Sequence, residues 1–128
     1  MTKNINKTVL VIDDTILITT EMSIYLNKFG FDVTTANNVE DGMTCFNNGK
    51  YRFVILDLLI PTEEDGLNLL QNLKNTIKSG NMNTDIIIMS ATSKNKNENK
   101  CKELGADFFV EKSSHWQNDL LNIINKRI

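Results

Sequence analysis

Acidic side chains follow two apolar runs of this chain at the point where each run ends. Asp13 and Asp14 follow residues 8–12, and Asp57 closes residues 53–57, in which four apolar residues precede it. Continuous apolar runs of this length are typical of strands that are buried on both faces of a parallel sheet. Because the carboxyl ends of parallel strands meet at one edge, we expect the three carboxylates to lie in one crevice.

Three carboxylates in one crevice raise each other's pKa values unless a cation lies among them. Their oxygens suit Mg²⁺, which takes a few carboxylates and completes its octahedron with water or phosphate oxygens. Ser90 and Lys112 follow two further apolar runs and bring a hydroxyl and an ammonium group to the same edge. A metal, an ammonium and a hydroxyl can hold a phosphoryl group while a carboxylate attacks it, as in enzymes that form aspartyl-phosphate.

The apolar pattern predicts five strands that alternate with helices along the chain. Such alternation forms a parallel sheet with right-handed crossovers and with helices on both faces. For five strands we expect an α/β, flavodoxin-like, doubly wound fold of strand order 2-1-3-4-5, whose switch point between strands one and three holds the acidic residues. The predicted strands span residues 8–12, 32–36, 53–57, 85–89 and 108–110.

Capping residues and glycines mark the expected helix ends. Asn38 can cap the second helix, Ser114 and Gln117 form a capping box for the last helix, and Gly30 is a natural stop for the first. The Asn- and Lys-rich fourth helix is expected to be short and mobile, because few apolar side chains hold it to the sheet. The first helix should end near Phe29 with that ring facing inward, the third should span about 65–78, and the fourth about 96–104.

Length and composition narrow the class of protein. The 128 residues suit a single domain, in which residues 1–7 are expected to form a frayed N-terminal tail. A net charge of −2 and a pI near 5.4 argue against direct nucleic-acid binding. We find no apolar run that could span a membrane and no signal-peptide pattern, so we expect a cytoplasmic protein without membrane contact. Cys45 and Cys101 are expected to be free thiols.

The set Asp13-Asp14, Asp57, Ser90 and Lys112, each at the end of its own strand, resembles the receiver domain of two-component response regulators. The resemblance covers nearly the whole chain and implies a single receiver domain over residues 1–128, in the manner of stand-alone chemotaxis-type receivers. It implies transfer of a phosphoryl group from a sensor histidine kinase or histidine phosphotransfer protein to Asp57 with Mg²⁺. Such a domain catalyses only its own phosphorylation and dephosphorylation, and it signals through a changed protein-binding surface.

The resemblance also implies a role for each residue of the site. Asp14 would be the principal acidic ligand of Mg²⁺. The full set of metal ligands would be Asp13, Asp14, Asp57 and the backbone carbonyl of Leu59, while Lys112 and Ser90 would hold the phosphoryl oxygens.

Phe109, three residues before the lysine, occupies the position of an aromatic side chain that moves between exposed and buried positions in this family. Its neighbours Phe108 and Val110 point to the opposite face of a strand, so Phe109 need not share their packing. Fixed packing of Phe109 in the sheet is the alternative on the sequence alone.

Two departures from the family pattern concern loops at the same edge. Residues 61–66 read Pro-Thr-Glu-Glu-Asp-Gly, one residue longer and more acidic than the usual Pro-Gly-x-Asp-Gly, so we expect a reshaped loop. Ser113 replaces the proline that usually follows the lysine. A cis bond before a non-proline residue costs about 3–4 kcal/mol, so we expect the Lys112–Ser113 bond to be trans.

Three other functions compete with this interpretation. One is a pseudo-receiver that signals without phosphate, against which the intact set of five residues argues. A flavodoxin-like nucleotide or flavin binder needs a phosphate loop rich in Gly, Ser or Thr after the first strand, where Asp13 and Asp14 stand instead. A phosphatase with Asp57 as nucleophile needs a second acid close behind it, where Leu59 stands. His115 is expected to be solvated, and Trp116 is either a partner contact or a packing residue.

Overall fold

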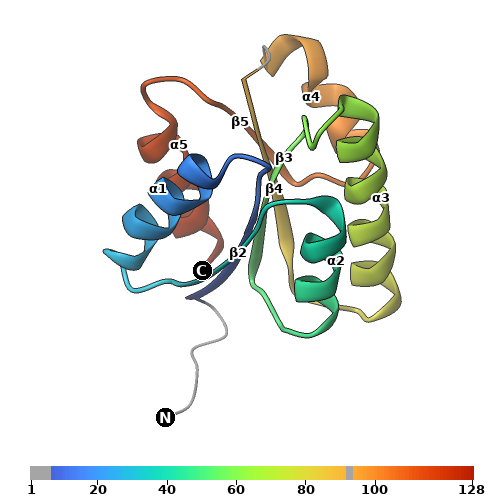
Figure 1. The fold of residues 1–128 in the computed structure, drawn as a ribbon, viewed down its shortest axis with the longest axis horizontal. Helices are drawn as coiled ribbons and strands as arrows, with labels where there is room; N and C mark the ends of the chain where they lie inside the picture. Colours follow the sequence, from blue (N-terminus) through green and yellow to red (C-terminus); the bar gives the residue numbers. More distant parts are fainter. Residues whose placement is uncertain (1–6, 92–93) are drawn as a thin grey trace.

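The computed structural model describes residues 7–91 and 94–128, with side chains left out for 94–97, so the expected frayed tail falls outside the described residues except for Lys7. Five strands form one parallel sheet in the order β2-β1-β3-β4-β5, as the sequence predicted (Figure 1). Continuous apolar runs form the central strands β1, β3 and β4, which are buried on both faces, whereas β2 is mostly unburied. The strands are β1 (Thr8–Ile12), β2 (Asp32–Ala36), β3 (Phe53–Asp57), β4 (Asp85–Ser90) and β5 (Phe108–Glu111).

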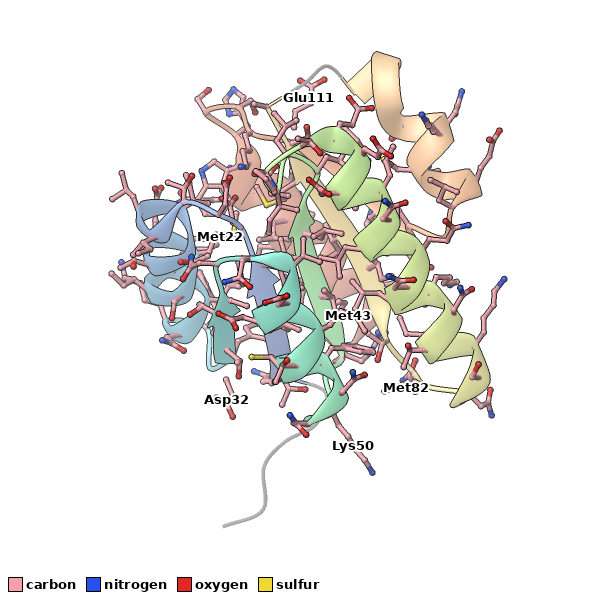
Figure 2. All side chains as sticks on the ribbon, turned by 45° about the vertical axis from the view of Figure 1, so that its right-hand side comes forward. Met22, Asp32, Met43, Lys50, Met82 and Glu111 are labelled. Carbon is pink, nitrogen blue, oxygen red and sulfur yellow. The ribbon has the colours of Figure 1, made fainter. Side chains whose placement is uncertain are left out.

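The register of the strands brings their carboxyl ends to one edge of the sheet. Ile12, the last residue of β1, pairs with Ala36 of β2 and Leu56 of β3, and Asp57 pairs with Met89 of β4. In Figure 2 this edge lies at the top, where Glu111 ends β5.

Helices cover both faces of the sheet and bury the alternating side chains of the strands. Leu10 and Ile12 of β1 pack in one core cluster, whereas Val9 and Val11 pack in the other. Figure 1 shows α1 and α5 on one face and α2, α3 and α4 on the other. The helices are α1 (Ile16–Asn27), α2 (Val39–Asn47), α3 (Glu63–Ser79), α4 (Lys94–Glu103) and α5 (Trp116–Arg127).

Two expectations about helix ends are wrong. Helix α1 ends at Asn27, two residues early, which leaves Phe29 44% exposed rather than facing inward, and Phe31 is buried after the turn at Gly30. The capping box of Ser114 with Gln117 does not form, because α5 begins only at Trp116 with no side-chain cap. The expected cap of α2 is confirmed, since Asn38 Oδ1 accepts a hydrogen bond of 2.7 Å from the Asp41 amide.

The lengthened acidic loop becomes an extra stretch of helix α3. The helix begins at Glu63, where Thr62 caps it by accepting a 3.1 Å hydrogen bond from the Asp65 amide. Gly66 then passes so close to β3 that a Cβ atom there would overlap the carbonyl oxygen of Leu58. The helix dipole favours acidic residues in a first helical turn, where Glu63, Glu64 and Asp65 lie. The extra residue of the loop therefore becomes part of α3.

The opposite edge of the sheet carries a cluster of charges, of which Arg52 and Asp85 are buried and Arg127 is exposed. Asp85 Oδ2 lies 2.9 Å from Arg52 Nη1 and 2.7 Å from Arg127 Nε, and Arg52 Nη2 donates to the Arg127 carbonyl at 2.8 Å. Arg52 is 4% exposed and Asp85 is 6% exposed. This cluster ties the end of α5 to β3 and β4.

Both cysteines are free thiols, as expected. Cys101 is buried, and burial together with the nearby charge of Glu63 raises its pKa to about 11. No helix in the described part of the chain has the length and apolar character needed to cross a bilayer.

Candidate functional site

The three predicted acidic residues meet at the carboxyl ends of β1 and β3. Asp13, Asp14 and Asp57 each present a carboxylate oxygen within 4.8 Å of the other two. Asp13 is 2% exposed and Asp57 is 7% exposed, whereas Asp14 faces solvent. The structure therefore confirms that these carboxylates share one crevice.

Lys112 reaches this crevice from the loop after β5. Its Nζ atom lies 2.8 Å from Asp13 Oδ2 and 3.2 Å from Asp57 Oδ2, so the ammonium joins the two buried acids. The Lys112 amide donates to the Ser90 carbonyl at 2.8 Å, which extends the pairing of β4 with β5 by one step. The Lys112–Ser113 bond is trans, as predicted, because Ile60–Pro61 is the only cis bond of the described backbone.

Burial and charge act against each other in this crevice. Burial raises the pKa of Asp57 and the charge of Asp13 adds to the increase, while the ammonium of Lys112 opposes it. Burial alone would lower the pKa of Lys112, but its hydrogen bond to Asp13 and the charge of Asp57 raise it instead. One ammonium thus contacts two of the three clustered carboxylates, and the surplus of hard oxygen donors fits a divalent cation such as Mg²⁺.

Ser90 and Leu59 lie in segments next to Asp57, on β4 and directly after β3. Ser90 ends β4 and is completely buried, next to Met89, which is the register partner of Asp57. The Leu59 amide donates to Asp57 Oδ1 at 3.3 Å, so this backbone segment lies against the carboxylate. The role of the Leu59 carbonyl as a metal ligand stays a prediction.

Phe109 lies on the face of the sheet that α2, α3 and α4 cover. It is 4% exposed and belongs to that core cluster, whereas Phe108 and Val110 pack on the opposite face. The predicted alternation along β5 is therefore confirmed. In this structure the ring occupies the inward position of the two that the sequence analysis considered.

Two residues that hold Asp13 were missed by the sequence analysis. The Thr15 amide donates to Asp13 Oδ1 at 3.0 Å, and Asn37 Nδ2 donates to the Asp13 carbonyl at 2.9 Å. Asn37 directly follows β2, which lies beside β1 in the sheet. Because the carboxyl ends of parallel strands meet at one edge, the position of Asn37 at this edge could have been predicted as well.

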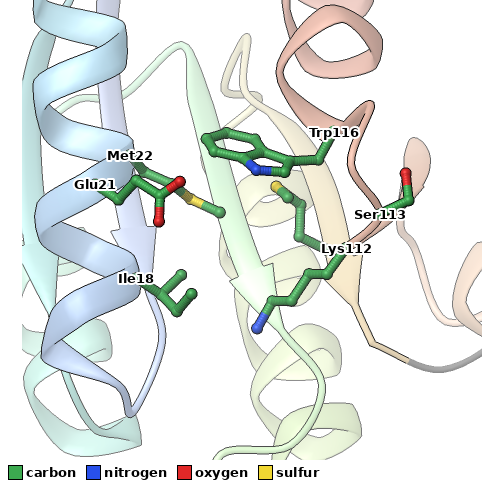
Figure 3. A pocket seen from close by; sticks show the side chains of 7 residues that line it. Ile18, Glu21, Met22, Lys112, Ser113 and Trp116 are labelled. Atoms are coloured by element: carbon green, nitrogen blue, oxygen red, sulfur yellow. The ribbon is translucent and has the colours of Figure 1, made fainter.

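A cavity of about 220 Å³ opens beside Lys112, between α1 and the start of α5 (Figure 3). Trp116 is half-buried and makes an edge-to-face contact with Tyr25 of α1, with 5.6 Å between ring centroids. This contact packs α5 against α1. His115 is exposed, as expected. The walls of the cavity are mostly apolar and include Ile18, Met22, Met89 and Trp116.

Known proteins similar to this chain include a transcriptional regulatory protein and receiver domains of solved structure. The CpxR homolog of Haemophilus influenzae, a transcriptional regulatory protein, is 34% identical over 98 residues, which are 77% of this chain and 40% of that protein. A receiver domain from Clostridium thermocellum has a TM-score of 0.80 at 26% identity, covering 94% of this chain and 93% of that chain. A CheY-like receiver from Methanospirillum hungatei has a TM-score of 0.82 at 21% identity, covering 94% and 92%.

The family model of the response regulator receiver domain matches residues 9–125, which include every residue of the crevice. The chain spans less than half the length of the curated relatives that it matches first. This match favours a receiver domain over a flavin or nucleotide binder and over a phosphatase, because it includes the acidic residues at the strand ends on which all three interpretations were based. The chain belongs to the response regulator receiver domain family.

Proposed function

We propose that this chain is a single receiver domain that accepts a phosphoryl group on Asp57 from a sensor histidine kinase or histidine phosphotransfer protein in the cytoplasm. The observation that carries the proposal is the buried Asp57 carboxylate at the end of β3, bridged by Lys112 to Asp13. The domain signals through protein contacts and turns over no substrate beyond its own phosphorylation and dephosphorylation.

In the proposed reaction a carboxylate oxygen of Asp57 attacks the phosphorus of a donor phosphohistidine. The new O–P bond forms as the P–N bond breaks, and the donor imidazole leaves with that electron pair. Lys112 moves its ammonium from the two carboxylates to the phosphoryl oxygens, and the Ser90 hydroxyl donates to the same group. When bound, Mg²⁺ neutralises charge that builds up on these oxygens. It would be held by Asp13, Asp14, Asp57 and the Leu59 carbonyl.

We propose that Phe109 communicates phosphorylation to the surface formed by α4, β5 and α5. When Ser90 is drawn toward the phosphoryl group, space opens behind it, and the balance between the exposed and buried positions of the Phe109 ring shifts toward the buried one. Phenylalanine has no hydroxyl to desolvate, so the inward position seen here is well suited to it. The sparse apolar face of α4 supports this proposal, because it holds that helix weakly.

The test is phosphorylation by a small phosphodonor, acetyl phosphate, with Mg²⁺, followed by intact-mass measurement. The wild-type chain should gain one phosphoryl group, and Asp57→Asn should gain none. Glu64→Gln is the matched control, since Glu64 is an exposed acid of the neighbouring α3 turn and should leave labelling unchanged. Undiminished labelling of Asp57→Asn would rule out the assignment. Structures with and without a phosphoryl mimic that share one Phe109 rotamer and one α4 position would rule out the Phe109 mechanism.

A further inference from the structure

Asn37 makes two hydrogen bonds at the edge of the acidic crevice, and both come from its side-chain amide nitrogen. One N–H group donates to the Asp13 carbonyl at 2.9 Å, and the other donates to Thr19 Oγ1 at 3.1 Å. The side chain is half-buried, at the corner between β2 and α2. Both N–H donors of the Asn37 amide are thus satisfied by groups at the edge of the crevice.

Thr19 extends this contact into helix α1. It is 2% exposed, and its hydroxyl donates to the Ile16 carbonyl at 3.1 Å while accepting from Asn37. The amide of Asn37 therefore joins three segments: the end of β1, the first turn of α1 and the corner after β2. The segment that carries Asp13 and Asp14 runs between the first two of these.

Every polar atom of Asp13 has a partner. Its amide donates to the Ala36 carbonyl at 3.1 Å, its carbonyl accepts from Asn37, its Oδ1 accepts from the Thr15 amide, and its Oδ2 accepts from Lys112. Lys112 and the Thr15 amide contact the carboxylate itself. The contacts of the Asp13 amide and carbonyl hold its main chain, and of these two only that of Asn37 comes from a side chain.

We infer that Asn37 is a positioning residue, which fixes the path of the Asp13–Asp14 segment and thereby sets the affinity of the crevice for Mg²⁺. The inference rests on the proposed function, because it takes the crevice to be a metal site. Partners that orient metal ligands without touching the metal commonly change affinity by about 10–100-fold when they are removed.

Asn37→Asp separates positioning from simple electrostatics. The aspartate has the same shape, but it cannot donate to the Asp13 carbonyl, and it adds a negative charge near the crevice. If charge alone governed affinity, this variant would bind Mg²⁺ more tightly than the wild type. Loss of positioning predicts the opposite sign, so the direction of the change is decisive.

The experiment is a calorimetric titration of the full chain with Mg²⁺ for the wild type, Asn37→Ala and Asn37→Asp. We expect both variants to bind about tenfold more weakly, and phosphorylation by acetyl phosphate to return to the wild-type rate at saturating Mg²⁺. Asn38→Ala is the matched control, because it removes the cap of α2 and lowers the melting temperature without touching Asp13. Its Mg²⁺ affinity should equal that of the wild type.

Thr19→Val is a second variant that keeps Asn37 and removes only its hydroxyl partner, and it should weaken Mg²⁺ binding by a smaller factor. An unchanged dissociation constant in Asn37→Ala, or tighter binding in Asn37→Asp, overturns the inference while leaving the proposed function intact. Failure of the wild type itself to bind Mg²⁺ and to accept a phosphoryl group overturns the proposed function, and this inference with it.

Discussion

Asp57 is held in a position that disfavours its own charge. Burial raises its pKa above the ordinary value of about 3.9 for an exposed aspartate. At neutral pH the folded chain therefore carries an ionised carboxylate at a cost in folding free energy. That cost is full above the raised pKa of the folded state, and it disappears below the ordinary pKa, where both states are protonated. Destabilised groups of this kind are common at functional sites.

Asp57→Asn should therefore stabilise the metal-free protein at neutral pH. A gain of about 1 kcal/mol corresponds to a rise in melting temperature of about 3–6 °C for a domain of this size. The difference between variant and wild type should shrink as the pH falls through the raised pKa of Asp57, and it should be gone below about 4. Thermal unfolding followed by circular dichroism across pH measures this, with Glu64→Gln as control. A lower melting temperature for Asp57→Asn at neutral pH would contradict the assignment of strain to this carboxylate.

At the scale of the elements, the cluster of Arg52, Asp85 and Arg127 fastens α5 to the sheet. Burial alone would raise the pKa of Asp85, but hydrogen bonds from Arg127 and Arg52 outweigh it and lower the pKa. A carboxylate with a lowered pKa adds stability that is present above its unfolded-state pKa and is lost as the pH falls through the folded-state value. This edge of the protein should therefore loosen in acid.

Asp85→Asn should cost about 3–5 kcal/mol of folding free energy, because it leaves the buried Arg52 without a counter-charge. Arg127→Met should cost less, since Arg127 is half-exposed and its removal leaves the pair of Asp85 with Arg52 intact. Urea unfolding at neutral pH measures both losses. Equal losses for the two variants would show that Arg52 is not the partner that depends on Asp85.

The elements also show where sequence patterns succeed and fail. Strands β1, β3 and β4 followed from continuous apolar runs, because a strand buried on both faces leaves such a signal, whereas β2 is mostly unburied and leaves a weaker one. Their order followed from the doubly wound fold that alternating strands and helices form. Helix ends depend on local competition, and α5 began past Ser114 because the chain first makes a turn in which the His115 amide donates to Ser113 Oγ. The extra residue after β3 lengthened α3, since Thr62 offered an earlier cap than the sequence analysis considered.

At the scale of the whole molecule, the candidate functional site and the charged cluster that holds α5 lie at opposite ends of the strands. The crevice of acids and Lys112 lies at the carboxyl ends of the strands, and the Asp85 cluster lies at the opposite edge. The crevice could be predicted because all its acids stand directly at strand ends. The contacts of Asn37 and Thr19 could not, because they depend on how the corner after β2 packs against the first turn of α1.

The cavity between α1 and α5 contains a natural fluorophore, the indole of Trp116. Trp116 is the only tryptophan, and it lines the same cavity as Lys112, so we expect its emission to change when that ammonium moves. Phosphorylation should shift the fluorescence of the wild-type chain as Lys112 leaves the two carboxylates, whereas Asp57→Asn treated with acetyl phosphate should give no such shift. Stopped-flow recording of this signal would give the rate at which the crevice rearranges, without any attached dye. Identical emission before and after complete phosphorylation would mean that Lys112 keeps its place.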